Sequence, residues 1–273
     1  MFDQKNDKSQ EKINERMNKI KHKIMVISGK GGVGKSSVAV NLSYGLALMG
    51  KRVGLLDVDI HGPSIGKMMG IEKLHLSESE EKGVIDPITK DNIKVVSMAS
   101  LMPETDQPVI WRGPLKMRAI SQFLSDINWG ELDYLIVDCP PGTGDEPLSI
   151  AQLIGKLDGT IVVTTPQDVS LLDASKTVNF SKMLNAPVLG IVENMSGFIC
   201  PHCGGSIDLF KSGGGKLLSE KQGVKFLGAV PFDMNLVQSS DKGRPFIYDF
   251  KESPAGKQMM EITREIIKVV EEK

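Results

Sequence analysis

The chain has 273 residues, of which 40% are hydrophobic and 25% are charged, as in soluble globular proteins. Its formal net charge of -1 excludes the strongly basic surface of a dedicated nucleic-acid-binding protein. No apolar run reaches the ~18–20 residues of a membrane-spanning helix. Three cysteines are too few for a disulfide scaffold, and the first residues lack the apolar stretch of a secretory signal. We therefore expect a cytoplasmic protein that binds neither nucleic acid nor membrane.

Residues 1–22 are dense in charged and amide side chains, and two structures fit them equally well. Ile13, Met17 and Ile20 recur at helical spacing, which predicts a short surface helix. The polar composition is also typical of a disordered tail. The folded domain is expected to fill residues 23–273.

From residue 23 onward, short apolar runs rich in β-branched residues alternate with helical stretches. The expected strands are 23–28, 52–57, 93–98, 134–138, 160–165, 188–193 and 225–230. The expected helices are 35–50, 115–127, 145–157, 168–184 and 254–271. Near-continuous hydrophobic strands are typical of parallel sheets that are buried on both faces. The alternation therefore predicts an α/β fold: one doubly wound, mostly parallel sheet flanked by helices, with ligands at the carboxyl ends of the strands.

The segment GKGGVGKSS, residues 29–37, fits the phosphate-binding pattern G-x-x-x-x-G-K-[ST] between an expected strand and an expected helix. Its glycines allow backbone N–H groups to surround phosphates, and the helix adds the positive end of its dipole. Lys35 is expected to reach the terminal phosphates, and the Ser36 hydroxyl is expected to ligate Mg²⁺. The expected nucleotide-binding residues of this P-loop are Gly29, Lys30, Gly31, Gly32, Val33, Gly34, Lys35, Ser36 and Ser37.

Acidic residues stand at the ends of two expected strands. Asp59 is expected to orient or deprotonate the attacking water, and Asp57 to associate with Mg²⁺ through water. The alternative for these two is a strand-ending turn with solvated carboxylates. Asp138, which ends the run YLIVD, is expected to hold Mg²⁺ mostly through water. Gly142 and Gly144 follow in a loop that is able to move with the γ-phosphate.

Two features bear on nucleotide choice and on a metal site. No guanine-reading [NT]-K-x-D motif follows an expected strand, and the amide of Asn194 is suited to adenine. Cys200 and Cys203 form a C-x-x-C in an insertion near 197–205, which supplies half of a four-ligand zinc or iron–sulfur site. No second C-x-x-C occurs, so a two-fold dimer is the simplest way to complete four thiolates.

Other interpretations of the cysteines stay open. The pair could be redox-active, although the thioredoxin-like context is absent, or could hold a structural Zn²⁺ across a dimer, or could be inert. Cys139 is expected to be a small buried residue, with a sensing role left open.

Two further segments are WRGP at 111–114, which precedes an expected helix, and FKSGGGKLLSE at 210–220. The latter lacks P-loop spacing and is expected to form a turn into a helix.

Several stretches together resemble the Mrp/ApbC family of iron–sulfur cluster carrier ATPases. They are GKGGVGKSSVAVNLSYGLALMGKRVGLLDVDIHGPS, WRGP, LDYLIVDCPPGTGDEPL, VENMSGFICPHCGG and VPFD. The resemblance covers about residues 23–270. GKGGVGKS, with its early lysine, resembles the P-loop of the deviant class, which positioning ATPases, arsenite-pump ATPases and nitrogenase iron proteins share. HGPS, PPGTGDE and CPHCGG narrow the resemblance to the carrier family.

The resemblance implies a homodimeric ATPase that binds a [4Fe–4S] cluster through Cys200 and Cys203 of each chain. It implies apo iron–sulfur clients and cluster-assembly scaffold proteins as partners, with ATP favoured over GTP. Lys30 would reach the partner's nucleotide and supply transition-state charge, the alternative being a solvated surface lysine. The chain looks like a minimal form without the N-terminal ferredoxin-like motif or extra domain of some relatives. Two other functions stay open: a positioning-type ATPase switch and a zinc-bridged, nucleotide-dependent regulator.

Overall fold

The computed structural model describes residues 2–59, 62–101, 113–200 and 202–272. Its helices are α1 (Phe2–Met17), α2 (Lys35–Leu48), α3 (Ile65–Met68), α4 (Gly113–Ser125), α5 (Asp145–Ile154), α6 (Asp168–Met183), α7 (Gly214–Gln222), α8 (Met234–Asp241), α9 (Phe246–Phe250) and α10 (Pro254–Glu271), with a 3-10 turn at Met98–Leu101. Its strands are β1 (Ile20–Ile27), β2 (Val53–Asp57), β3 (Ser77–Glu78), β4 (Ile85–Asp86), β5 (Ile88–Lys90), β6 (Ile93–Ser97), β7 (Leu132–Asp138), β8 (Gly159–Thr164), β9 (Val188–Ile199), β10 (Ser206–Ile207) and β11 (Phe226–Phe232).

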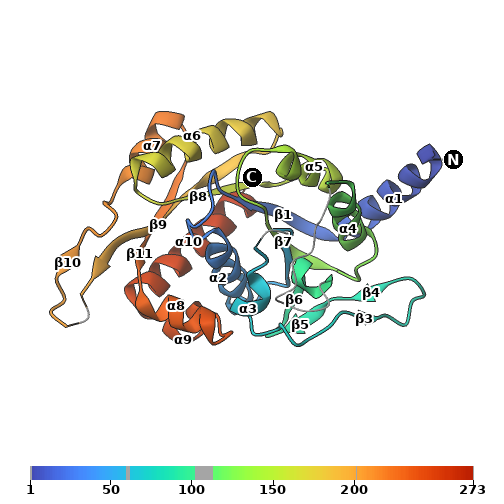
Figure 1. Cartoon of the computed structure of the whole chain (residues 1–273), viewed down its shortest axis with the longest axis horizontal. Coiled ribbons are helices and arrows are strands. Elements are labelled where there is room, and N and C mark those ends of the chain that lie inside the picture. Colours follow the sequence, from blue (N-terminus) through green and yellow to red (C-terminus); the bar gives the residue numbers. More distant parts are fainter. Residues whose placement is uncertain (1, 60–61, 102–112, 201, 273) are drawn as a thin grey trace.

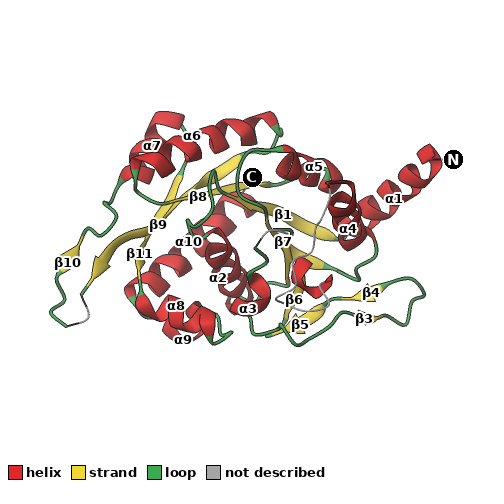
Figure 2. Ribbon diagram, viewed as in Figure 1, coloured by secondary structure: helices red, strands yellow, loops and turns green. Residues whose placement is uncertain are grey.

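A nine-stranded sheet runs through the molecule in the order β10-β9-β8-β1-β7-β2-β6-β5, and β11 also pairs with β9 (Figure 2). The pairs are parallel except β5 with β6 and β9 with β10. All residues of β2 and β8 are buried, because helices cover both faces of the sheet. One hydrophobic cluster joins the sheet to α2, α9 and α10, and a second joins it to α1 and α4–α7. The predicted doubly wound, mostly parallel fold is confirmed.

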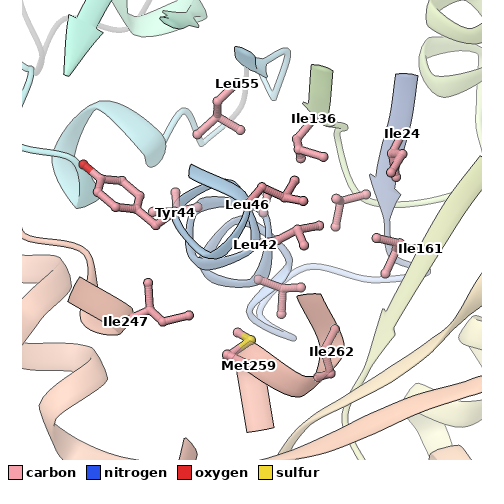
Figure 3. Close-up of a cluster of buried hydrophobic side chains, with 14 of the residues drawn as sticks. Ile24, Leu42, Tyr44, Leu46, Leu55, Ile136, Ile161, Ile247, Met259 and Ile262 are labelled. Carbon is pink, nitrogen blue, oxygen red and sulfur yellow. The ribbon is translucent and has the colours of Figure 1, made fainter. Parts of the chain in front are cut away.

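The helix that leaves the P-loop, α2, lies inside the first cluster (Figure 3). Leu42 and Leu46 of this helix lie among Ile136 and Ile161 of the sheet and Met259 of α10, and all five side chains are at most 1% exposed. Burying a side chain of this size stabilises the fold by about 1.5–3 kcal/mol. The helix α2, which follows the P-loop directly, is therefore fixed against the sheet on one side and against α10 on the other.

In the structure, Phe2–Met17 form the helix α1, and the second half of this helix packs into the hydrophobic core. Ile13 and Met17 of α1 are buried against the second cluster, where α1 contacts α4 and α5. Strand β1 begins at Ile20, three residues before the expected start. Lys21 is exposed and His22 is half-buried, whereas Ile20 and all residues from Lys23 to Ile27 are buried. Lys23 is buried and donates from Nζ to the carbonyls of Met17 and Ile20, which caps the end of α1.

The C-x-x-C lies at the turn of a hairpin that projects from the body, at the opposite end of the molecule from α1 (Figure 1). The outgoing strand, β9, continues to Ile199, six residues beyond its expected end at 193, and β10 returns antiparallel to it. Between α3 and β6, the chain forms the short β3–β4 pair and then β5, which pairs with β6 at the sheet edge. Gly113 and Pro114 of the WRGP segment begin α4; Trp111 and Arg112 lie outside the described residues.

None of the helices in the described parts of the chain is both long and apolar enough to cross a bilayer.

Replacing Ile13 by alanine tests whether α1 is an integral part of the fold. The side chain is 0% exposed, so Ile13→Ala should lower the free energy of unfolding by about 2–5 kcal/mol. Glu15→Ala, at an exposed position of the same helix, should change it by less than about 0.5 kcal/mol. Chemical denaturation of both variants measures the difference, and equal small effects would mean that α1 is detached in solution.

Candidate functional site

The predicted phosphate site forms because three parallel strands end at the same edge of the sheet. Asp57 at the end of β2 is in register with Asp138 at the end of β7. Val26 of β1 is in register with Asp138 on the other side, and residues 29–37 follow β1 directly. The carboxyl ends of parallel strands are where this fold class binds ligands. The P-loop and the predicted acidic residues are thus brought together.

Lys35 occupies the centre of this site. Its Nζ lies 2.7 Å from Asp138 Oδ1 and 3.7 Å from Asp59 Oδ2, and its side chain is 6% exposed. Burial by itself lowers the pKa of Lys35, but the charge of Asp138, the hydrogen bond to it and the charge of Asp59 raise it above its usual value. The ammonium group therefore stays charged, ready to meet an anion.

Asp57 is fully buried behind this lysine. Its Oδ2 accepts a hydrogen bond from Ser97 Oγ at 2.8 Å, and its Oδ1 accepts one from the backbone N–H of Asp59 at 3.1 Å. Burial, together with the neighbouring charge of Asp138, raises the pKa of Asp57 to about 8. Ser97 was not among the sequence-predicted residues, although its place at the end of β6 was a usable signal. The predicted water-mediated contact of Asp57 with Mg²⁺ stays a prediction.

Two carboxylate oxygens in the site fit a divalent cation. Asp59 Oδ1 and Asp138 Oδ2 are buried and have no hydrogen-bond partner within the described chain. Ser36 Oγ lies 3.5 Å from Lys35 Nζ, beside these carboxylates. Carboxylate and hydroxyl oxygens are the ligands that Mg²⁺ prefers, and the ion would neutralise charge on bound phosphates. Ser36 would ligate it directly, and Asp138 through water.

The P-loop encloses a cavity of about 300 Å³. The cavity is lined by Ser28, Lys30, Gly31, Gly32, Gly34, Lys35, Ser36, Ser37, Asp59, Gly62, Ser64, Met68 and Pro141. Gly32 and Gly34 take left-handed conformations with φ of 79° and 81°, which glycine adopts without strain. A Cβ at Gly31 or Gly32 would meet no atom within 4 Å, so this side of the loop is open to a ligand. The loop that follows β7 reaches the same cavity, because Gly142 N–H donates to the Ser28 carbonyl at 2.8 Å.

Two of the predicted nucleotide-binding residues face the protein. A Cβ at Gly29 would lie 2.5 Å from the backbone of Asp173 in α6, so this glycine permits a close helix contact. Val33 is 2% exposed, and its carbonyl accepts a hydrogen bond from Asn194 Nδ2 at 2.9 Å. The Asn194 amide thus supports the P-loop from behind, and its predicted contact with adenine stays a prediction. Lys30 lines the cavity and is half-buried; its action across a dimer likewise stays a prediction.

The cysteine pair forms a separate, exposed site. At the hairpin turn, Cys200 N–H donates to the Gly205 carbonyl and Gly204 N–H donates to the Cys200 carbonyl, both at 2.9 Å. Cys203 is exposed, and Cys200 is partly exposed. The backbone N–H groups of Cys203 and His202 lower the pKa of the Cys200 thiol, which favours the thiolate that binds metals.

One chain supplies only this pair of thiolates in the described structure, where no group of three or more His, Cys, Asp or Glu side chains is placed to hold a metal. Cys139, beside Asp138, is 0% exposed as expected, and burial raises the pKa of its thiol. A buried neutral thiol is unreactive, in contrast to the pair at the hairpin turn.

Comparison with known proteins agrees with this geometry. Residues 19–267 match the family described as ParA, NUBPL iron-transfer P-loop NTPase. The chain belongs to this family of P-loop NTPases. An iron-sulfur cluster carrier protein of Methanocaldococcus jannaschii is 52% identical over 262 residues, which span 96% of this chain and 89% of the relative. The resemblance to iron–sulfur cluster carrier ATPases is therefore confirmed.

Two solved structures have the same fold as this chain. A nucleotide-binding protein of Archaeoglobus fulgidus in complex with ADP is 40% identical, with a TM-score of 0.77 over 88% of this chain and 93% of that one. The septum site-determining protein MinD of Pyrococcus horikoshii, in complex with Mg-ADP, is 20% identical with a TM-score of 0.67. It covers 90% of this chain and 96% of its own, and shares the fold.

Gly34→Ala tests the packing of the P-loop against Asn194. A Cβ at Gly34 would lie 2.1 Å from Asn194 Nδ2, and the left-handed backbone is strained for alanine. We expect nucleotide affinity to fall by about tenfold or more, because the phosphate cradle must shift.

Gly50→Ala is the matched control, since Gly50 has a similar φ of 78° but no atom within 4 Å of a Cβ. It should cost about 1 kcal/mol of stability and leave nucleotide affinity unchanged. Titration with a fluorescent ADP derivative compares the two variants. Equal affinities in both would contradict the account of the loop.

Proposed function

We propose that the protein is an ATP-dependent carrier that binds a [4Fe–4S] cluster between two copies of the chain and transfers it to apo-proteins. The observation that carries the proposal is the exposed Cys200–Cys203 pair at the hairpin turn of a P-loop NTPase domain. One chain offers two thiolates, and a [4Fe–4S] cluster takes four. A two-fold dimer brings the pair together twice and completes the set. The carrier name of the 52% identical relative supports the same cargo.

The nucleotide would bind as ATP in the cavity of the P-loop. The 40% identical nucleotide-binding protein of Archaeoglobus fulgidus, which is in complex with ADP, supports this. Lys35 would leave Asp138 to meet the terminal phosphates, because phosphate oxygens offer the ammonium group a denser negative charge. Asp59, whose Oδ1 accepts no hydrogen bond from a described residue, would orient the attacking water and accept its proton. Water then adds to the γ-phosphorus as the bond to the ADP oxygen breaks. Lys30 of the second copy would stabilise the charge that develops.

The cluster is cargo in this proposal, and its exposed binding site suits transfer. The lowered pKa of Cys200 favours the thiolate, which is the form that binds iron. Three free thiols persist in a reducing compartment, so we place the protein in the cytoplasm. Scaffold proteins of cluster assembly would load the site, and apo iron–sulfur proteins would receive the cluster. Binding to nucleic acid or membrane forms no part of this cycle.

Serine substitution of both cysteines of the pair tests the cargo. After anaerobic reconstitution, the unmodified protein should hold about four iron and four acid-labile sulfide per two chains, and Cys200→Ser/Cys203→Ser should hold neither. Cys139→Ala is the control and should retain both, since that thiol is buried away from the hairpin. Zinc without sulfide in the unmodified protein would instead support the zinc-bridged regulator, and iron that survives loss of the pair would exclude the carrier.

Lys35→Ala tests the coupling to ATP. The variant should lose ATP binding and cluster transfer to an apo-ferredoxin, because it removes the one lysine that Asp138 and Asp59 hold in the described site. It should still bind iron and sulfide through the cysteine pair. Transfer is followed by the absorbance and activity of the recipient protein. Transfer at the unmodified rate would show that the carrier works without ATP.

A further inference from the structure

The hairpin that carries the cysteines is held at its base by one buried carboxylate. Glu193 of β9 is 0% exposed, and no lysine, arginine or histidine of the described chain forms an ion pair with it. Its partners are neutral donors: Ser196 Oγ at 2.5 Å and Gly213 N–H at 2.8 Å on Oε1, and Gly215 N–H on Oε2. Ser196 lies on the strand that leaves for the cysteines, and the two glycines lie on the segment that returns. The carboxylate thus joins both limbs of the hairpin.

The glycine run 213–215 explains how a charged group is accepted there. Gly213 is the N-cap of α7 with a φ of 81°, and a Cβ at Gly215 would lie 3.0 Å from Glu193 Cβ and Oε2. A Cβ at Gly214 would lie 2.5 Å from Leu171 of α6. The N–H groups at a helix N-terminus favour an anion. The segment 210–220, which resembles a phosphate loop without its spacing, therefore forms a cradle for the chain's own carboxylate.

The residue next to this carboxylate contacts the nucleotide site. Asn194 Nδ2 donates to the Val33 carbonyl in the P-loop at 2.9 Å, and Asn194 is 4% exposed. Two consecutive residues of β9 therefore connect the P-loop to both limbs of the cysteine hairpin.

Between these residues and the cysteines, β9 departs from regular pairing. Its register with β11 passes from Asn194–Val230 to Phe198–Phe232, so four steps on β9 match two on β11. Met195 and Gly197 within this bulge have φ of 57° and 74°. A non-glycine residue in the left-handed region persists only where its surroundings hold it. The hydrogen bond from Ser196 Oγ to Glu193 Oε1 ends inside this bulge, so the carboxylate contacts β9 where its regular pairing is interrupted.

We propose that Glu193 is a positioning residue for the Cys200–Cys203 pair, and that through Asn194 it makes the orientation of the hairpin respond to the nucleotide. The inference rests on the proposed function, since it names the residue that couples the two sites of that function. Phosphates that draw the N–H groups of the P-loop inward also shift the Val33 carbonyl. Because the Asn194 amide is hydrogen-bonded to this carbonyl, Asn194 moves with it. The bulge and the hairpin, which continue from Asn194 along β9, then change their orientation.

Thiol alkylation in the full-length, cluster-free protein tests this coupling without relying on cluster chemistry. The rates at which iodoacetamide modifies Cys200 and Cys203 are measured by mass spectrometry, with and without Mg²⁺ and a non-hydrolysable ATP analogue. Buried Cys139 reports unfolding in the same samples. Nucleotide affinity is measured separately with a fluorescent ADP derivative.

In the unmodified protein, the nucleotide should change the alkylation rate of the pair by about fivefold or more. Glu193→Gln replaces one acceptor oxygen by an N–H₂ group that faces the N–H of Gly213 or of Gly215. It should reduce this response below about twofold while nucleotide affinity and Cys139 protection are kept. Gln222→Ala is the matched control, because it removes the hydrogen bond from α7 to Ser175 of α6 but leaves the cradle intact. It should respond like the unmodified protein.

A full response in Glu193→Gln would overturn the inference, and so would an unmodified protein that binds nucleotide without any change at the pair. In the latter case the carrier function would still stand on its iron and sulfide content. An unmodified protein that binds no nucleotide would overturn the proposed function as well. If Glu193→Gln exposes Cys139, Ser196→Ala decides: a weakened response supports the inference, and an unchanged response contradicts it.

Discussion

Lys35 carries a single positive charge into a buried site where three carboxylates converge. Asp57, Asp59 and Asp138 arrive there because β2 and β7 are parallel neighbours in register. Isolated buried charges each cost several kcal/mol, so the lysine and Asp138 stabilise each other, and burial raises the pKa of Asp57. The remaining negative charge is the reason that the site suits a divalent cation and a phosphate together. The sheet register, the placement of α2 and the P-loop conformation all serve this one balance of charge.

The same sheet places the Cys200–Cys203 pair away from the P-loop, because its strand β9 extends beyond the body of the sheet. β9 begins in the core next to β8, passes behind the P-loop at Asn194 and ends beside Cys200. Its core half is held by parallel pairing on both sides. Its outer half is held by the Glu193 carboxylate, by the pair of Phe198 with Phe232 of β11 and by a short antiparallel pair with β10. A strand that is paired on both sides at one end and interrupted by a bulge at the other is suited to link the nucleotide site to the cysteine pair.

Much of this structure follows from patterns within short segments. The P-loop, the aspartates that end β2 and β7 and the alternation of strands and helices each depend on local sequence, and the structure brings them together as expected. Features that depend on contacts between distant segments could not be predicted. The docking of α1 needed the apolar surfaces of α4 and α5, and Ile13 alone fitted a surface helix equally well. The extension of β9 through Met195 and Gly197 was hidden, because a bulge resembles a turn in sequence.

The hydrogen bonds that organise the sites also depend on contacts between distant segments. Ser97 meets Asp57 only because β6 lies beside β2, and Glu193 meets Gly215 across 22 residues of chain. A carboxylate in a strand and a glycine run beyond it carry no sequence signal of their contact. Asn194 shows the reverse case: the amide was singled out for its chemistry, and the structure gives it a second use against the Val33 carbonyl.

Native mass spectrometry of the anaerobically reconstituted protein tests the central claim most directly, because it reports chains and cargo in one measurement. The account predicts a two-chain species that carries a single [4Fe–4S] cluster, alongside cluster-free chains. A cluster on a single chain, or two chains that carry only zinc, would contradict it.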